Sequence, residues 1–470
     1  LVEFQGNSEQ ELTDLALSAA PMFDALPVVS PVTMTSKLSE RNALWAARRG
    51  LYTTVAGNRP TGTNALLEDV VVPVDVLGTT CRDLTALFDA HGYQDSVIFG
   101  HAKDGNIHFM LNEQFRDAKQ LVRYREFTEE MVQLILDADG SLKAEHGTGR
   151  IMAPFVRRQF GDELFEVMRE IKRLIDPKGF LNPGVVLADE DTDYATDLKV
   201  AETVEEEVDR CVECGYCEPV CPSKDLTLTP RQRIVLRREI AAAEANGDTK
   251  LAERLRQEYE YYGVDTCAVD GMCVTRCPVL INTGDLVRRL RAENQDALGA
   301  AGWKFASKHW GTIDKVAGKA LTAAKMLPFP VVRGATDIGR KLFGEDLVPA
   351  YKKGLSAGGA PRVPHAEANP DIVFFPACVN AMFGGVDGEG KHDPVNATQA
   401  FIRLCERAGV KYRVPEGIDQ MCCGTPWKSK GYTDGYSIMS DRVLKALWQA
   451  TDGGRIPIVC DASSCTEGLE

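Results

Sequence analysis

Four closely spaced cysteines constrain this chain more than any other feature of its sequence. They lie in the run Cys211-Val-Glu-Cys214-Gly-Tyr-Cys217-Glu-Pro-Val-Cys221-Pro222. The C-x2-C-x2-C-x3-C-P spacing matches the run that binds a cubane iron–sulfur cluster. In such a run three thiolates bind one cluster, and the fourth reaches the other cluster of a pair. The spacing therefore predicts a second run.

The second run is Cys267-Ala-Val-Asp270-Gly-Met-Cys273-Val-Thr-Arg-Cys277-Pro278, in which Asp270 stands where the second thiolate is expected. One cluster would take four thiolates, from Cys211, Cys214, Cys217 and Cys277. The other would take three, from Cys221, Cys267 and Cys273. It would be completed by Asp270 as an oxygen ligand, or it would be an incomplete three-iron cluster.

The alternative interpretations of these cysteines are a zinc site and disulfides. Zinc sites rarely use a quartet that ends in proline. Seven of the fourteen cysteines lie in the two runs, which in a long chain is typical of a reducing cytoplasm. No window of about 18 uncharged apolar residues suggests a membrane span, and the net charge of −14 argues against general nucleic-acid binding. We expect a cytoplasmic protein, with peripheral contact at the inner face of the membrane as an option.

A length of 470 residues predicts about three domains. Leu1 is not an initiator and the chain stops just after a cysteine pair, so we expect a piece of a longer polypeptide. Strand and helix patterns alternate over residues 1–187, with strands at 1–4, 68–76 and 96–99 and helices at 8–20 and 78–90. We expect an α+β multidomain protein with an acidic linker at 188–209, an iron–sulfur domain at 210–295, a basic linker at 296–365 and an α/β domain at 366–470.

Two histidines flank a turn in Gly100-His101-Ala-Lys103-Asp104-Gly105-Asn106-Ile-His108. As flanks of a hairpin they lie on one face, close enough to share a metal. Taken alone, they are equally well explained as loop or core histidines. The Gly-rich segment Lys143-Ala-Glu145-His146-Gly147-Thr-Gly149 adds a carboxylate and a third imidazole. Two histidines, a carboxylate and open positions are typical of a catalytic zinc or similar divalent site, and an unligated His146 suits a general base.

GHAKDGNIH and EHGTGR resemble the GHxGDGNxH and EHG motifs of FAD-linked D-2-hydroxyacid oxidoreductases, the group that contains D-lactate and D-2-hydroxyglutarate dehydrogenases. The motifs lie in the C-terminal cap domain of that group, which has a ferredoxin-like sheet. Residues 171–184, which end in Asn182-Pro-Gly, resemble the signature that closes the domain beside the flavin. The resemblance covers residues 1–187. The cysteine-rich tail resembles large bacterial members that carry flavin and iron–sulfur parts in one chain.

The resemblance assigns roles to several residues. It implies three metal ligands, which are His101, His108 and Glu145. It makes His146 the base that takes the substrate hydroxyl proton, and it places Asn182, with Asn106 of the first motif, near the flavin. Arg48, in Leu44-Trp45-Ala-Ala-Arg48, matches the arginine that binds the substrate carboxylate, although a surface arginine is the alternative. FAD is implied by the resemblance alone, because no Gly-rich phosphate loop occurs before residue 100.

Lys103 departs from the family motif, which has Gly at this position. We hypothesise that Lys103 pairs with a second substrate carboxylate; a solvated loop lysine is the alternative. The expected reaction is oxidation of a D-2-hydroxyacid, preferably D-2-hydroxyglutarate to 2-oxoglutarate, with electrons passed through the clusters to a quinone or another carrier. The alternatives are D-lactate or glycolate oxidation, and a non-catalytic electron-transfer subunit. We expect a homo-oligomer.

The remaining segments follow from local patterns. Thr229 before Pro230 predicts a helix start, and helices at 232–245 and 249–262 favour an α-helical ferredoxin with two iron–sulfur clusters. Residues 304–353 hold ten Lys/Arg and four Asp/Glu, which fits a linker that pairs with the protein's own acids or a segment resting on an anionic membrane. Residues 366–470 are expected to have strands at 371–375 and 456–459 and a helix at 398–408. They resemble an incomplete CCG domain because they contain five cysteines in a similar pattern, which are Cys378, Cys422, Cys423, Cys460 and Cys465. Whether they hold a cluster or are structural stays open.

Overall fold

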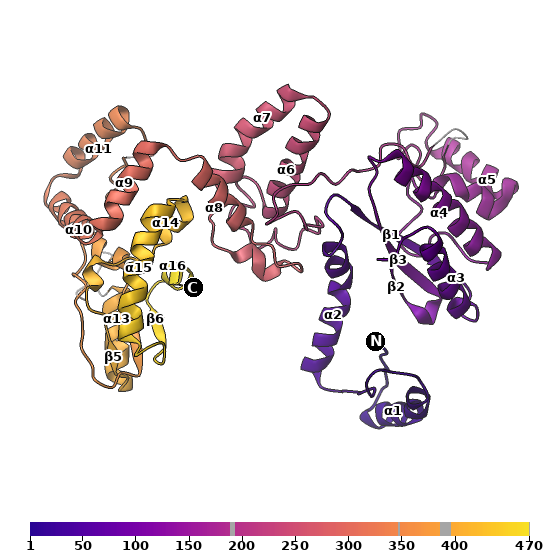
Figure 1. The fold of residues 1–470 in the computed structure, drawn as a ribbon, viewed down its shortest axis with the longest axis horizontal. Helices are drawn as coiled ribbons and strands as arrows, with labels where there is room; N and C mark the ends of the chain where they lie inside the picture. Colours follow the sequence, from indigo (N-terminus) through magenta and orange to yellow (C-terminus); the bar gives the residue numbers. More distant parts are fainter. Residues whose placement is uncertain (189–192, 346–347, 386–395, 470) are drawn as a thin grey trace. The chain divides into compact units, whose positions relative to one another are not determined.

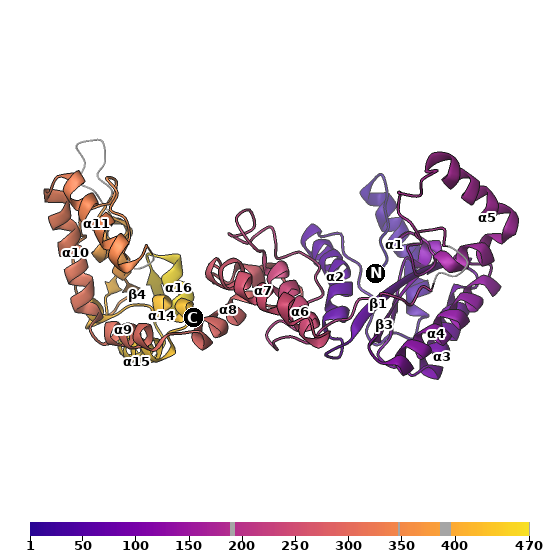
Figure 2. The ribbon, with the colours of Figure 1, turned by 90° about the horizontal axis from the view of Figure 1, so that it is seen from above.

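The computed structural model describes residues 1–188, 193–345, 348–385 and 396–469. It divides into two compact units. The first comprises Leu1–Tyr259 with Met272–Asn282, and the second comprises Glu260–Gly271 with Thr283–Glu470. Figures 1 and 2 show the elements of each unit from two directions.

The first unit contains a three-stranded antiparallel sheet of order β1-β3-β2. Its strands are β1 (Asn64–Val71), β2 (Val97–Phe99) and β3 (Asn106–Glu113). Helices α3 (Leu77–Ala90) and α4 (Ala118–Asp137) lie side by side against it (Figures 1 and 2). The strands expected at 68–76 and 96–99 are thus present with shifted ends, and helix α3 lies where a helix at 78–90 was expected.

The two faces of this sheet have different roles. Ile107, Phe109 and Leu111 are at most 1% exposed and pack with residues of α3 and α4 into one core. Because successive side chains of a strand point to opposite faces, His108 lies on the other face. There it pairs directly across the ladder with Asp69 of β1. The alternation that fills the core therefore also places polar side chains together on the opposite face.

Residues 1–4 form no strand, in contrast to the expectation from their apolar pattern. No strand among the described residues pairs with them, and an unpaired strand leaves its backbone groups without partners. Helix α1 (Glu9–Asp24) does begin at Ser8, whose side chain accepts the Glu11 backbone N–H. Helix α2 (Leu38–Gly57) follows, and η2 (Ala153–Phe155) and α5 (Val156–Ile175) come after the sheet.

The cysteine-rich part of the first unit contains a helical hairpin of α6 (Pro230–Ala245) and α7 (Thr249–Tyr259). Thr229 caps α6, with Pro230 at the first position of the helix, as the sequence predicts. Gln232 completes a reciprocal cap with Thr229, which the sequence analysis did not predict. Helix α7 ends before the predicted residue 262, because the chain continues as the π-helical segment η3 (Glu260–Asp265). The short η4 (Met272–Arg276) carries part of the second cysteine run.

The second unit contains a small parallel sheet of order β5-β4-β6, made of β4 (Ile372–Phe375), β5 (Tyr412–Arg413) and β6 (Ile458–Cys460). Its helices precede and surround this sheet. They are α8 (Thr283–Glu293), α9 (Ala297–Lys308), α10 (Trp310–Met326), α11 (Phe329–Phe343), α12 (Cys378–Met382), α13 (Ala397–Ala408), α14 (Thr425–Lys430), α15 (Thr433–Ala450) and α16 (Ser463–Leu469).

The segment expected to be a partly helical basic linker at 296–365 contains α9, α10 and α11. Helix α9 packs along α15 (Figure 1), and Trp310 is buried in the core of the second unit. Lys304 pairs with Asp434 at 2.7 Å, and Lys315 pairs with Asp419 at 2.8 Å. The segment therefore satisfies part of its positive charge within its own unit. None of the helices that the structure describes is long and apolar enough to cross a membrane.

Candidate functional site

The β2–β3 hairpin is closed by the short helix η1 (Ala102–Asp104). The backbones of His101 and Asn106 exchange two hydrogen bonds, of 3.2 and 3.3 Å between nitrogen and oxygen. Gly105 has φ of 68°, and a Cβ there would lie 1.9 Å from the carbonyl oxygen of Val72. The turn therefore requires glycine. Because Asn106 pairs with His101 and His108 pairs with Phe99, both histidines lie on one face of the hairpin.

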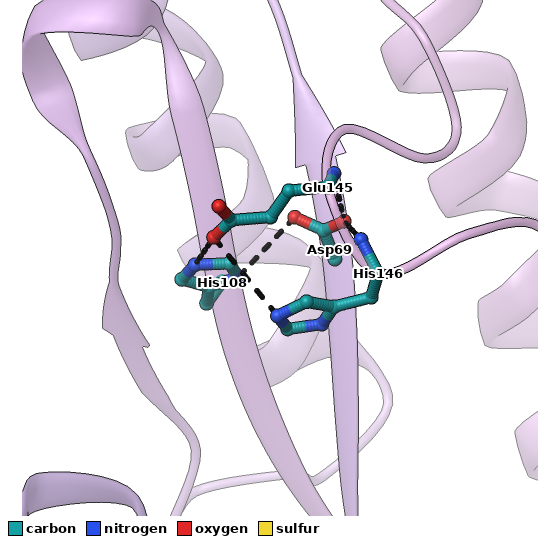
Figure 3. A group of neighbouring side chains, drawn as sticks. All are labelled: Asp69, His108, Glu145 and His146. Carbon is teal, nitrogen blue, oxygen red and sulfur yellow. Dashed lines mark hydrogen bonds and ion pairs between the residues drawn. The ribbon is translucent and has the colours of Figure 1, made fainter.

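Three imidazole nitrogens gather around one carboxylate oxygen on that face. Glu145 Oε1 lies 2.9 Å from Nε2 of His108, 3.2 Å from Nε2 of His101 and 4.0 Å from Nε2 of His146. Figure 3 shows Glu145 and His146 approaching His108 from the loop that follows α4. The His108 and His146 rings stack with centroids 4.8 Å apart. This loop supplies the carboxylate and the third imidazole that the sequence pattern indicates.

These residues fit a divalent metal in their donor chemistry. Imidazole nitrogens and a carboxylate oxygen are ordinary zinc ligands. His108 is 3% exposed. Burial lowers the pKa of His108 and outweighs the nearby Asp69 carboxylate, which acts to raise it. The neutral imidazole that ligation requires is therefore the favoured form. His101, Glu145 and His146 are exposed, so the group is open on the side opposite the buried strand.

Asp69 is a site residue that the sequence analysis missed. Its side chain is fully buried, and one of its oxygens together with atoms of His108, Glu145 and His146 forms a group whose members lie within 4.8 Å of one another (Figure 3). Burial raises the pKa of Asp69, but hydrogen bonds from the backbone N–H groups of His146 and Glu145 and from Asn106 outweigh it and lower the pKa overall. The signal in the sequence was a pair of consecutive acids, Glu68 and Asp69, next to the apolar residues of a strand.

Arg48 lies on α2, far from the motifs in sequence, yet its guanidinium carbon is 5.7 Å from the centre of the Phe99 ring. The Phe99 ring is in turn 5.4 Å from the ring of His108. The fold therefore brings Arg48 to the neighbourhood of the histidines. Lys103 is exposed on η1, inside the turn between His101 and Asn106.

The two asparagines expected near a flavin have different surroundings. Asn106 is 6% exposed and donates from Nδ2 to Asp69 Oδ1 at 2.7 Å, so a buried hydrogen bond connects the start of β3 to β1. Asn182 is exposed in a turn with φ of 42°. That turn continues to Val186, whose backbone N–H donates to the carbonyl of Gly149 at 3.3 Å. The Asn182 turn thus adjoins the loop of Glu145 and His146. A flavin contact by either residue stays a prediction.

Most of the predicted cluster ligands lie in the first unit. Burial, together with the neighbouring thiols of Cys211, Cys273 and Cys277, raises the pKa of Cys217 to about 12. Burial also raises the pKa of Cys211, which again has Cys277 beside it. The end of the second run therefore lies near the first run, as a cluster that takes Cys277 requires. Cys214 is exposed.

The other predicted ligands are described for each unit separately. Cys221 and Cys273 are each 8% exposed in the first unit, where Arg233 donates to Cys221 Sγ at 3.9 Å. Cys267 and Asp270 belong to the second unit. There, the guanidinium of Arg291 donates to the backbone carbonyl of Cys267 at 3.0 Å.

Five cysteines gather at the carboxyl ends of β4 and β6 in the second unit. Cys378 Sγ lies 3.5 Å from Cys422 Sγ. Cys423 shares hydrogen bonds with Cys422 and Cys465, and these lower its pKa. Burial raises the pKa of Cys460 to about 11, with Cys423 among its neighbours. The sequence grouping of these thiols is therefore also a spatial grouping.

Comparisons with known proteins match the same two regions. Residues 1–186 match the family described as FAD linked oxidases, C-terminal domain. The first region is a C-terminal domain of the FAD-linked oxidases. Residues 207–281 match the family described as 4Fe-4S dicluster domain, so the chain joins that domain to an iron–sulfur domain.

Several curated proteins are similar to parts of this chain. Glycolate oxidase subunit GlcD of Bacillus subtilis is 30% identical over 150 residues, which are 32% of this chain and 31% of the relative. A probable mitochondrial D-lactate dehydrogenase of Danio rerio is 31% identical over 147 residues, 31% of this chain and 29% of the relative. D-2-hydroxyglutarate dehydrogenase of Escherichia coli is 26% identical over 275 residues, 47% of this chain and 27% of the relative. The chain thus spans about a third of the length of the curated relatives that it matches.

Proposed function

We propose that this chain carries the substrate site and the electron exit of an enzyme that oxidises a D-2-hydroxyacid, with FAD as the first electron acceptor. The observation that carries the proposal is the meeting of His101, His108 and His146 at one oxygen of Glu145. The match of residues 1–186 to FAD-linked oxidases supports it. The names of the relatives, a glycolate oxidase and dehydrogenases of D-lactate and D-2-hydroxyglutarate, indicate the substrate class.

The proposed roles follow from chemistry and position. His101, His108 and Glu145 would hold a divalent metal, most simply Zn²⁺, and such an ion lowers the pKa of a hydroxyl bound beside it. His146, exposed and stacked on His108, takes the hydroxyl proton at Nε2. Arg48, on the Phe99 side of the same face, binds the substrate carboxylate. FAD supplies the acceptor for the hydride.

The dicluster domain suits the second half of the reaction, because a flavin takes electrons in pairs and many carriers take them singly. We propose that electrons leave through the two clusters to a quinone or another carrier. The second cluster has three irons or takes Asp270 as a ligand. A further cluster on the five thiols of the second unit, peripheral membrane contact and a homo-oligomer stay predictions. Lys304 and Lys315, which pair with acids of their own unit, weigh against membrane contact.

D-2-hydroxyglutarate is the proposed substrate, because Lys103 offers a cation beside the site for a second carboxylate. The alternative, D-lactate or glycolate, has support from the names of two relatives. Anaerobic mixing of the flavin-containing protein with equal concentrations of D-2-hydroxyglutarate and D-lactate separates the two. We expect faster flavin bleaching by the dicarboxylate. Faster bleaching by D-lactate would transfer the assignment to the alternative, and no bleaching by any D-2-hydroxyacid would support a non-catalytic electron carrier.

Lys103→Gly is expected to raise the KM for D-2-hydroxyglutarate about tenfold, as the loss of one charge-assisted pair of about 1.4 kcal/mol would. The KM for D-lactate should stay within about twofold, because D-lactate has no second carboxylate. Steady-state kinetics on both substrates measures this. Lys119→Gly, at an exposed lysine of α4, is the control for general charge loss. An equal rise in KM for both substrates would contradict the role of Lys103.

A further inference from the structure

Both oxygens of Asp69 are engaged by the groups that build the proposed metal site. Oδ2 accepts three consecutive backbone N–H groups, those of Ala144 at 3.1 Å, Glu145 at 2.7 Å and His146 at 2.8 Å. Oδ1 accepts Nδ2 of Asn106 at 2.7 Å and lies 3.3 Å from Nδ1 of His108. One buried carboxylate thereby joins the loop to the hairpin (Figure 3).

This arrangement differs from that of a metal ligand. Asp69 faces Nδ1 of His108, whereas Glu145 faces Nε2 on the far side of the same ring. A metal bound between Nε2 and Glu145 would therefore have the His108 ring between it and Oδ1. Direct ligation by Asp69 would also break hydrogen bonds from the loop or from Asn106. The carboxylate instead stands where metal-ligating histidines place their hydrogen-bond acceptor.

The buried Nδ1 of His108 makes no well-aligned hydrogen bond to the part of the chain that the structure describes. Asp69 Oδ1 is nonetheless 3.3 Å away, so a small rotation of the ring completes this bond. When Nε2 binds a metal, Nδ1 must carry the proton and becomes a donor. Metal binding and the His108–Asp69 hydrogen bond therefore reinforce each other.

We propose that Asp69 is a positioning residue that fixes the ligand loop and orients His108 for the metal. The inference rests on the proposed metal site. It assigns to Asp69 two separate tasks. One oxygen holds the backbone of residues 144–146, so Glu145 and His146 are set in place before any metal arrives. The other oxygen accepts the proton of His108 Nδ1, which directs Nε2 toward Glu145.

Asp69→Asn is the variant that tests this, because it keeps the shape and replaces one acceptor by a donor. Whichever way the amide turns, its NH₂ group meets either the three loop N–H groups or the donors of Asn106 and His108. We expect Mn²⁺ binding to weaken by about 10–100-fold, the usual effect of removing an outer partner of a ligating histidine. Mn²⁺ prefers oxygen and nitrogen donors to thiolates, so its titration, followed by electron paramagnetic resonance, is little affected by the cysteines.

Hydrogen exchange gives a second readout that does not depend on metal. The peptide that spans residues 141–149 should exchange faster in Asp69→Asn, because three of its amides lose their acceptor. Glu113→Gln is the matched control, since Glu113 is also fully buried, lies on β3 and is hydrogen-bonded to Tyr93 and Arg123 away from the site. It should change neither Mn²⁺ affinity nor exchange of this peptide. If Asp69→Asn does not fold, Asn106→Ala is the second variant. It keeps the Asp69 carboxylate but removes the hydrogen bond that Asn106 donates to it, and is expected to weaken Mn²⁺ binding severalfold.

Mn²⁺ affinity of Asp69→Asn within twofold of the wild type would overturn the inference. So would unchanged exchange over residues 141–149. If the proposed metal site does not exist, the result is different, because the wild-type protein itself would then show no Mn²⁺ binding that depends on His108. In that case the exchange measurement alone decides whether Asp69 holds the loop.

Discussion

Replacing His108 with Ala is expected to abolish binding of the proposed divalent metal and to lower kcat/KM by at least about 10³-fold. The substitution takes away the buried imidazole whose Nε2 meets Glu145. A metal-bound hydroxyl group gains several kcal/mol of stabilisation in the transition state, and about 4 kcal/mol corresponds to about 10³-fold. Elemental analysis after dialysis measures the metal, and the rate of anaerobic flavin reduction measures the activity.

His91→Ala is the control for loss of a histidine in the same domain. His91 ends α3 and pairs with Glu130 at 3.3 Å, away from the site. It should keep both metal and activity. A His108→Ala protein that retains its non-iron metal would show that the ion binds elsewhere, and the metal assignment would then be wrong.

Replacing Arg123 with Met is expected to lower the free energy of unfolding by about 3 kcal/mol, through a buried charge left without its partner. Glu113 is fully buried on β3, and the Arg123 guanidinium binds both its oxygens at 2.8 Å. Tyr93 donates to the same carboxylate at 2.6 Å, and burial, with this bond, raises the pKa of Tyr93. Removal of Arg123 leaves Tyr93 as the remaining side-chain donor to Glu113 among the described residues.

Arg125→Met is the matched comparison, because Arg125 lies two residues away on α4 and pairs with Asp193 near the surface. Exposed pairs contribute at most about 1 kcal/mol, so this variant should lose far less stability. Urea unfolding followed by circular dichroism measures both. Equal losses in the two variants would mean that the buried Glu113 cluster does not carry the stability assigned to it.

The sequence predicted the parts of the site that depend on local pattern. The hairpin around Asp104-Gly105 and the capped start of α6 follow from short-range chemistry, and both are present. The sequence predicted that Glu145 lies near His101 and His108 only because two separate motifs together supply the ligands of one metal. The structure adds the reason, since Asp69 on a third segment binds the loop that carries Glu145.

The failures come from long-range packing. Residues 1–4 have a strand-like apolar pattern, but a strand needs a neighbouring edge that local sequence does not reveal. Residues 296–365 were expected to be a partly helical basic linker because their charge is uneven, whereas Trp310 and the contact of α9 with α15 make them part of the second unit. Asp69 was missed because Glu68 and Asp69 form no recognised motif, and the role of Asp69 appears only when its hydrogen-bond partners are known.

The measurement that tests the central claim most directly is the rate of anaerobic flavin reduction by D-2-hydroxyglutarate in the flavin-containing protein, before and after removal of its divalent metal. The account predicts that reduction is lost with the metal, returns when Zn²⁺ or Mn²⁺ is added back, and does not return in His108→Ala. Reduction at an unchanged rate in metal-depleted protein, with its clusters intact, would contradict it.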